Sequence, residues 1–142
     1  MIRNWLLFLS LAMVTLKCSA QNMPCWIQSL PSRTTTYYYR VSQGTGFTEE
    51  QAERQAFATA LLESAFAVGV PVDMQKLERM KGDSLLIEAS RYVKIPINKV
   101  CCYVEALVTR RGYRAYVLCQ VAVNANVIPD FKSFNCITNK EE

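Results

Sequence analysis

Residues 44–69 read GTGFTEEQAERQAFATALLESAFAVG, and this stretch predicts the helix on which the fold depends. Thr48 and Gln51 have the spacing of a capping box, in which the two residues satisfy free amides at the start of a helix. Phe47 and Ala52 stand where a hydrophobic staple forms across that start. We therefore expect a helix to begin at Thr48.

The pattern within this helix predicts how it packs. Gly69 suits the end of the helix, and Pro71 prevents its continuation. Two rows of residues recur with helical spacing, and the small residues of the first row favour close contact with a sheet. The first row is Ala52, Ala56, Ala60 and Ser64, and the second is Phe57, Leu61, Ala65 and Val68.

The segments before the helix predict one strand. Residues 34–41 (TTTYYYRV) are rich in β-branched and aromatic side chains, which suit a half-buried strand. Residues 42–46 (SQGTG) indicate a turn that requires permissive backbone angles. Residues 21–33 contain two prolines and no sustained period, so we expect an extended lead-in.

Three further strands are expected after the helix. Residues 72–83 lack a clean period and indicate a loop, with room for a helical turn over 75–80. From 85 to 95 apolar residues alternate with polar ones, which predicts a long strand. Residues 100–109 and 113–124 form two more β runs joined by Arg110-Arg111-Gly112, and they predict an antiparallel hairpin.

These elements predict a single α+β domain over residues 34–126. It contains an antiparallel or mixed sheet of about four strands with one main amphipathic helix packed on one face, in the order strand, helix, strand, strand, strand. Residues 127–142 lose all periodicity and are expected to be a C-terminal tail, solvated over 139–142.

Residues 1–20 have the pattern of a signal peptide. Arg3 precedes an apolar run over residues 5–16 that is too short to cross a bilayer, and Cys18-Ser19-Ala20 places small residues at a cleavage site. The mature chain would begin at Gln21. The competing interpretation is a lipid-anchored Cys18, although Lys17 stands where a small residue is wanted. No later apolar run is long enough to span a membrane.

Charge and composition exclude several classes of function. Lys and Arg number 16 and Asp and Glu 12, and removal of Arg3 and Lys17 with the signal leaves 14 against 12, a net charge of +2. This balance argues against nucleic acid as a partner. The chain has no histidine, which removes the commonest general base and metal ligand. We therefore expect no catalytic residues, no cofactor and no metal site.

Two local patterns resemble functional motifs but favour plainer roles. Gly44-Thr45-Gly46 lacks the third glycine and the Lys-Ser/Thr of phosphate-binding loops, and Glu49 and Glu50 would repel an anion there. The acidic residues at the start of the helix, which include Glu53, are expected to be solvated rather than to form a catalytic pair. Neither pattern predicts catalysis.

Five cysteines remain after cleavage, so at least one thiol is left over in an oxidising compartment. A three-residue loop would pair Thr109 with Tyr113, which would make Cys101 and Cys119 diagonal neighbours and poorly placed for a bridge. Any disulfide is therefore expected to join Cys25 to Cys136, whose segments are irregular and able to adjust. Cys101, Cys102 and Cys119 are then expected to be thiols, the last two as small core residues.

Aromatic and basic side chains suggest a partner surface. Packing and solubility explain the same residues, so both interpretations stay open. The candidate residues are Tyr38, Arg110, Arg111, Tyr113 and Arg114.

Over residues 36–123 the order of motifs resembles a known family. The aromatic strand, the GTGFTEEQAERQAFATALL segment and the final YRAYVLCQVAV strand resemble the LPP-type (LPP-twenty-like) bacterial envelope lipoprotein family. The domain of that family is similar to the N-terminal domain of flagellar assembly protein T. The resemblance implies an envelope domain used for binding or assembly, and it transfers no catalytic residue. The matching positions are Gly44, Gly46, Thr48, Glu49, Ala52, Ala56, Val104, Glu105, Tyr116, Val117 and Val121.

The leading functional hypothesis is an exported, non-enzymatic envelope protein. It would act as a binding or assembly module in the periplasm or at the outer membrane, or outside the cell, with another envelope protein or envelope component as its partner. The alternative is a secreted thiol-dependent redox protein or enzyme that uses the cysteines.

The pattern of residues 1–20 makes a prediction about processing. Intact mass and N-terminal sequencing of the protein from the cell envelope should show a chain that begins at Gln21, because Ser19 and Ala20 complete a cleavage site. A diacylglycerol-modified Cys18 at the N-terminus would instead establish the lipid-anchored form.

Overall fold

In the computed structural model, which describes residues 23–80 and 83–142, the helix expected from Thr48 is α3 (Glu49–Ala67). Thr48 Oγ1 accepts a hydrogen bond from the Gln51 amide at 3.1 Å, as the capping pattern predicts. At the other end Gly69 has a φ of +82°, and the Val70 amide donates to the Ala65 carbonyl at 3.1 Å. Both expected ends of the helix are confirmed. The leader at 1–20, with Cys18, lies outside the described residues.

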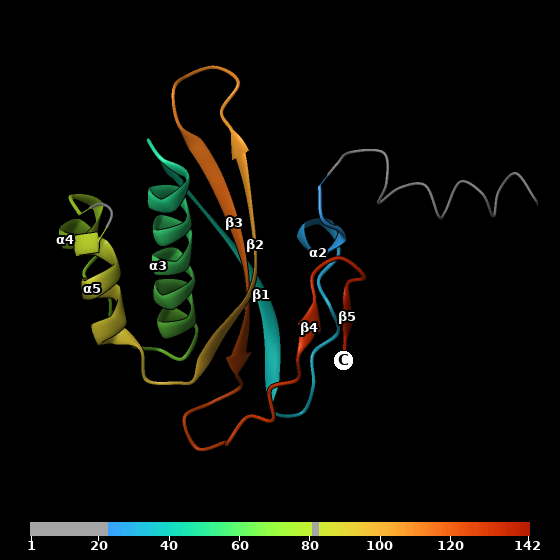
Figure 1. The fold of residues 1–142 in the computed structure, drawn as a ribbon. Helices are drawn as coiled ribbons and strands as arrows, with labels where there is room; N and C mark the ends of the chain where they lie inside the picture. Colours follow the sequence, from blue (N-terminus) through green and yellow to red (C-terminus); the bar gives the residue numbers. More distant parts are fainter. Residues whose placement is uncertain (1–22, 81–82) are drawn as a thin grey trace, which may run out of the picture.

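The main sheet has three antiparallel strands in the order β1-β3-β2. They are β1 (Tyr37–Gly46), β2 (Ile97–Ala106) and β3 (Tyr113–Ala122). Figure 1 shows α3 lying along one face of this sheet. The α+β class is confirmed, and one strand fewer than expected belongs to the main sheet.

The contact between β1 and α3 is unusually close, and it corrects the turn expected over residues 42–46. A Cβ atom added to Gly44 would lie 2.3 Å from the Ala56 nitrogen, and one added to Gly46 would lie 2.6 Å from the Ala52 nitrogen. The two glycines therefore extend β1 beneath the helix, where any side chain would collide with helix backbone. Ala52, Ala56 and Ala60 are fully buried in the resulting core.

The strand expected over residues 85–95 is wrong, because α5 (Asp83–Tyr92) occupies most of that range. Alternation with period two also places Leu85 and Ala89 four residues apart, so the same residues suit one face of a helix. Both are buried against Leu61 and Ala58 of α3. The second row of α3, which includes Leu61, faces away from the sheet, and α5 packs against this part of it. The short α4 (Met74–Glu78) overlaps the helical turn expected over residues 75–80.

The hairpin of β2 and β3 is confirmed, but its register is wrong. Ala106 pairs with Tyr113, so the connecting loop runs over residues 107–112 and is longer than the three residues expected. A register shift between Lys99 and Cys101 marks a bulge in β2. Cys101 therefore lies opposite Leu118, and both residues join the core on the face of the sheet remote from α3.

Residues 127–142 are not a tail outside the domain, because they cover this second face of the sheet. They include the short strands β4 (Phe134–Asn135) and β5 (Lys140–Glu141), which lie beside α2 (Cys25–Gln28) in Figure 1. The lead-in expected to be extended over residues 21–33 therefore contains a helical turn, and Trp26 of that turn is buried there together with Tyr37 and Tyr39 of β1. The tyrosines thus pack away from α3.

Hydrogen bonds tie the C-terminus to those tyrosines. Glu141 Oε1 accepts from the Tyr37 hydroxyl at 2.8 Å and from the Tyr39 hydroxyl at 2.5 Å. Burial, followed by the Glu141 carboxylate, raises the pKa of Tyr39 above its ordinary value. Gln120 Nε2 donates to the Lys132 carbonyl at 2.8 Å. The last residues are therefore part of the fold.

The disulfide joins Cys101 to Cys136, which corrects the expected pair of Cys25 and Cys136. The bulge in β2 brings Cys101 onto the second face, and the returning C-terminal segment places Cys136 beside it, with a Cα–Cα distance of 5.8 Å. On the chain-entropy model a bridge across a separation of 35 residues contributes about 4 kcal/mol. Cys101 is therefore not a thiol.

The close contact between β1 and α3 predicts the effect of a single added methyl group. Gly44→Ala should lower the free energy of unfolding by about 3 kcal/mol, because the new Cβ meets helix backbone that cannot move away locally. Ala56→Glu should cost at least as much, since it buries a charge in the same contact. Thr48→Ala, which removes only a cap, should cost about 1 kcal/mol. Chemical denaturation measures all three, and a Gly44→Ala variant no less stable than Thr48→Ala would contradict this packing.

Candidate functional site

The hairpin loop closes over the end of β1 and the start of α3. The Leu107 amide donates to the Gly112 carbonyl at 3.0 Å and fixes the base of the loop. Gly112 has a φ of +119°, and a Cβ there would lie 2.7 Å from the Gly46 carbonyl oxygen. Only glycine allows this close approach. The loop is therefore held against the residues that lead into the helix.

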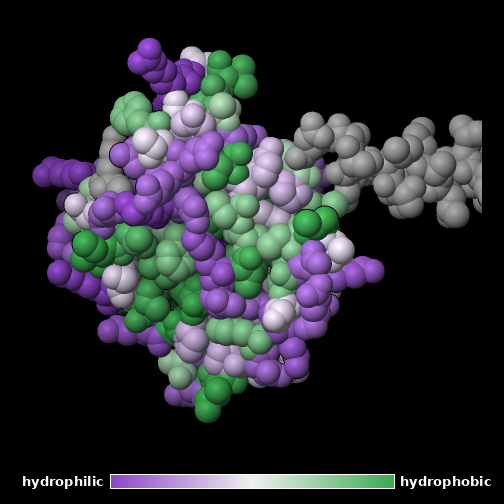
Figure 2. Space-filling model, viewed as in Figure 1, coloured by the Kyte–Doolittle hydropathy of each residue, from purple (hydrophilic) through white to green (hydrophobic). Residues whose placement is uncertain are grey.

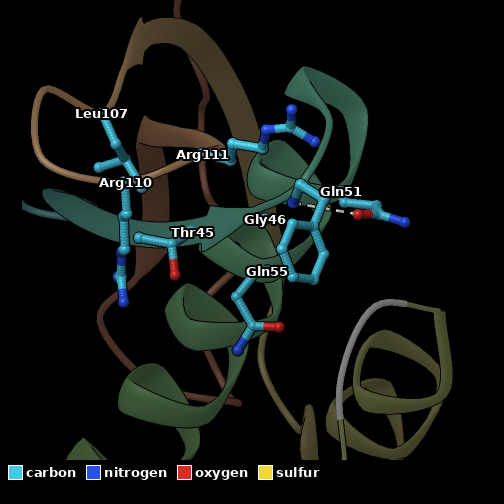
Figure 3. A pocket seen from close by; sticks show the side chains of 8 residues that line it. Thr45, Gly46, Gln51, Gln55, Leu107, Arg110 and Arg111 are labelled. Carbon is cyan, nitrogen blue, oxygen red and sulfur yellow. Dashed lines mark hydrogen bonds between the residues drawn. The ribbon is translucent and has the colours of Figure 1, made fainter.

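An open cleft of about 640 Å³ lies between this loop and α3. Figure 3 shows Arg110 and Arg111 extending from the loop in different directions, Arg110 on the side of Thr45 and Arg111 on the side of Gln51. The Phe47 amide donates to Gln51 Oε1 at 3.2 Å, which holds that side chain at the rim. The lining residues are Thr45, Gly46, Phe47, Gln51, Gln55, Leu107, Arg110 and Arg111.

The charge of the cleft comes from its two arginines. Neither Arg110 nor Arg111 forms an ion pair with any residue in the described part of the chain. A guanidinium stays protonated at any ordinary pH and matches the oxygens of a carboxylate or a phosphate in a two-pronged hydrogen bond. The cleft therefore suits an anionic group.

The two segments that form the cleft also carry exposed apolar side chains. Phe47 is 79% exposed and Val108 is 98% exposed. Because Phe47 keeps most of its surface exposed, the hydrophobic staple expected between Phe47 and Ala52 can bury little of it. We call the set of Phe47, Leu107, Val108, Arg110 and Arg111 the hairpin end.

The structure brings together only part of the predicted partner surface. Arg110 and Arg111 belong to the hairpin end, and Tyr113 and Arg114 follow at the start of β3. Tyr113 packs partly against the core beneath α3, whereas Arg114 lies opposite Glu105 in the register. Tyr38 pairs with Val121, which lies eight positions along β3 from Tyr113. Eight strand residues span roughly 25 Å, so Tyr38 lies about that far from Tyr113. Tyr38 therefore does not belong to this site.

Sequence reasoning missed Phe47, Leu107 and Val108 as members of the site. The staple expected of Phe47 and the strand expected over residues 100–109 both gave these apolar residues a packing role, so neither stood out as an exposed contact. Their neighbourhood depends on the long loop and on the contact between Gly112 and Gly46, neither of which has a local signature.

A second group of charged residues, between α3, α5 and β2, is held in ion pairs that join two cations to three carboxylates. Arg54 bridges Glu50 and Asp83, and Lys99 pairs with Glu53. The Arg54–Asp83 and Lys99–Glu53 pairs join α3 to its neighbours, whereas Glu50 is paired within α3 and its side chain stays 72% exposed, as expected of a solvated residue. Ion pairing therefore gives these charged residues a structural role.

The thiols that the structure describes near α3 are weak nucleophiles. Cys119 is buried, as expected, and burial raises the pKa of its thiol to about 12. Cys102 was expected in the core but lies exposed on the edge strand β2. Its thiol lies against Glu53, and partial burial, followed by the Glu53 carboxylate, raises the pKa to about 11. Both thiols are therefore protonated near neutral pH.

Two searches within residues 23–80 and 83–142 gave negative results. No group of three or more His, Cys, Asp or Glu side chains there could hold a metal ion. None of the described helices combines the length and the apolar character needed to cross a membrane.

Comparison of the chain with models of known protein families, with curated proteins and with solved structures finds no match.

The raised thiol pKa values predict slow alkylation of the folded protein. At pH 8, Cys102 should react about 100-fold more slowly than a thiol of ordinary pKa 9.0, because its pKa of about 11 leaves about one hundredth of the thiolate. The rate should rise about tenfold per pH unit up to pH 10, and Cys119 should react only on unfolding. Mass mapping of the modified peptides measures both. Rapid labelling of Cys102 near neutral pH would instead favour the thiol-dependent function.

Proposed function

We propose that this chain is an exported, non-enzymatic binding module of the bacterial cell envelope, and that it binds an envelope component through the hairpin end. The observation that carries the proposal is the open cleft with two arginines that lack partners in the described chain, flanked by exposed Phe47. Cationic and apolar side chains concentrated on one projecting loop are typical of recognition surfaces.

Export is supported by two independent features. The first is the charged start, apolar run and small-residue site of residues 1–20. The second is the Cys101–Cys136 bridge, because disulfides form and persist in oxidising compartments such as the periplasm. The second observation does not depend on the first.

Binding is favoured over catalysis by the chemistry of the cleft. Arginine neither takes nor gives a proton at ordinary pH, and the amides of Gln51 and Gln55 do not titrate. These groups orient and hold a ligand, whereas acid–base catalysis needs a group whose pKa lies near the working pH. The resemblance to the LPP-type envelope family implies the same kind of role.

The thiol-dependent alternative has weaker support. It would use Cys102, the exposed thiol, but the raised pKa of that group keeps it in the unreactive form. Cys101, its neighbour in the sequence, is already bound to Cys136 and lies on the opposite face of the sheet.

Chemical crosslinking in intact envelopes tests the proposal. A tagged chain should recover a specific envelope component, and Arg110→Glu with Arg111→Glu should lower the yield at least tenfold by removing the anion-binding groups. Arg33→Glu with Arg79→Glu is the matched control, because it makes the same change in net charge at exposed residues outside the cleft. Equal losses in both double variants would contradict a role for the hairpin end. Loss of the component on Cys102→Ser would favour thiol chemistry.

A further inference from the structure

The hairpin end projects from the molecule as a convex tip. Figure 1 shows the loop between β2 and β3 extending beyond the first turn of α3, and Figure 2 shows strongly hydrophobic and strongly hydrophilic residues side by side at that end. Val108, at 98% exposure, packs on almost nothing. A side chain in that position contributes little to the fold and is available for contact.

The side chains of the tip combine two kinds of attraction. Phe47 and Val108 offer apolar surface, and Arg110 and Arg111 offer charge without partners in the described chain. A few apolar side chains alone, or a few cations alone, hold a protein on a bilayer only weakly, whereas the two together add. Arginine also places its charge at the headgroups while its stem stays in the apolar boundary.

From this arrangement we infer that the component bound by the hairpin end is the surface of an anionic phospholipid membrane. Val108 and Phe47 enter the boundary between headgroups and acyl chains, and Arg110 and Arg111 bind lipid phosphates at the mouth of the cleft. The inference rests on the proposed function and names its ligand class.

An acidic protein is the competing partner, and the shape of the site argues against it. Specific protein interfaces bury about 800 Å² on each side with a well-packed centre, which a broad surface supplies more readily than a narrow tip. Here Val108, the most exposed large apolar side chain in the described part of the chain, belongs to the projecting loop between β2 and β3. A tip of this kind fits a fluid layer that closes around it.

The neighbouring acidic residues set the orientation of the contact. The first turn of α3 carries Glu49 and Glu50, and Glu50 is paired with Arg54. An anionic surface repels the carboxylate of Glu49, so the loop and Phe47 meet the membrane while the first turn of α3 faces away from it. The contact is therefore confined to the tip, and salt should weaken it strongly.

Vesicle binding tests the inference with a chain that starts at Gln21, which retains every described element and carries no acyl group. The chain should sediment with vesicles of phosphatidylcholine and phosphatidylglycerol at low salt, but not with pure phosphatidylcholine. Arg110→Glu with Arg111→Glu should reduce binding at least tenfold. Arg33→Glu with Arg79→Glu, which changes net charge equally, should reduce it far less.

Insertion of the tip has its own readout. Val108→Trp should shift its fluorescence to shorter wavelength on the anionic vesicles, whereas Ile137→Trp, at a site 94% exposed in the β4–β5 turn, should not. Phe47→Ser should weaken binding several-fold, and Phe66→Ser should not, although Phe66 is 74% exposed near the other end of α3. Unchanged fluorescence of Val108→Trp on vesicles that do bind the protein would overturn the inference.

The result can separate this inference from the proposed function. If the chain does not bind anionic vesicles while envelope crosslinking still depends on Arg110 and Arg111, the ligand is not the membrane surface. A protein partner is then the ligand of the hairpin end. If vesicle binding is equal in both double arginine variants, the hairpin end is wrong as the contact. If neither vesicles nor envelopes are bound, the proposed function fails as well.

Discussion

The contact between the glycines of β1 and the alanine row of α3 is the constraint on which the rest of the structure depends. Gly44 and Gly46 allow helix backbone to lie where their Cβ atoms would be. Close packing of this kind buries Ala52 and Ala56 completely and fixes the position of α3 on the sheet. The second row of α3 is then directed away from the sheet, where α5 covers it.

The same contact positions the candidate site. Because β1 runs straight beneath the start of α3, the chain leaves Gly46 at the edge of the sheet and exposes Phe47. Gly112 approaches the Gly46 carbonyl and brings the hairpin loop to the same place. The cleft thus combines the end of β1 and the start of α3, which are adjacent in the sequence, with a loop that lies much further along the chain. Binding groups on such a loop are held by a rigid scaffold.

The second face of the sheet is closed by a different device. The C-terminal segment is short and has little periodicity, yet the Cys101–Cys136 bridge and the hydrogen bonds from Tyr37 and Tyr39 to Glu141 hold it in place. These interactions involve no residue of α3 or of the hairpin end. The sheet is therefore buried on one face by a helix and on part of the other by irregular chain, and the loop remains exposed.

Local patterns in the sequence determined the α+β class, the two ends of α3, the hairpin and the arginines of the cleft, because caps, helical rows and strand alternation depend on near neighbours. Tertiary structure alone decided the helix over residues 83–92. The apolar residues of this segment fit both the period of a strand and the period of a helix, and packing against the face of α3 turned away from the sheet favours the helix. It also decided the register, since one bulge and a longer loop move every pair. The disulfide and the neighbours of Arg110 depend on that register. A single sequence has no local pattern that shows which distant residues come together.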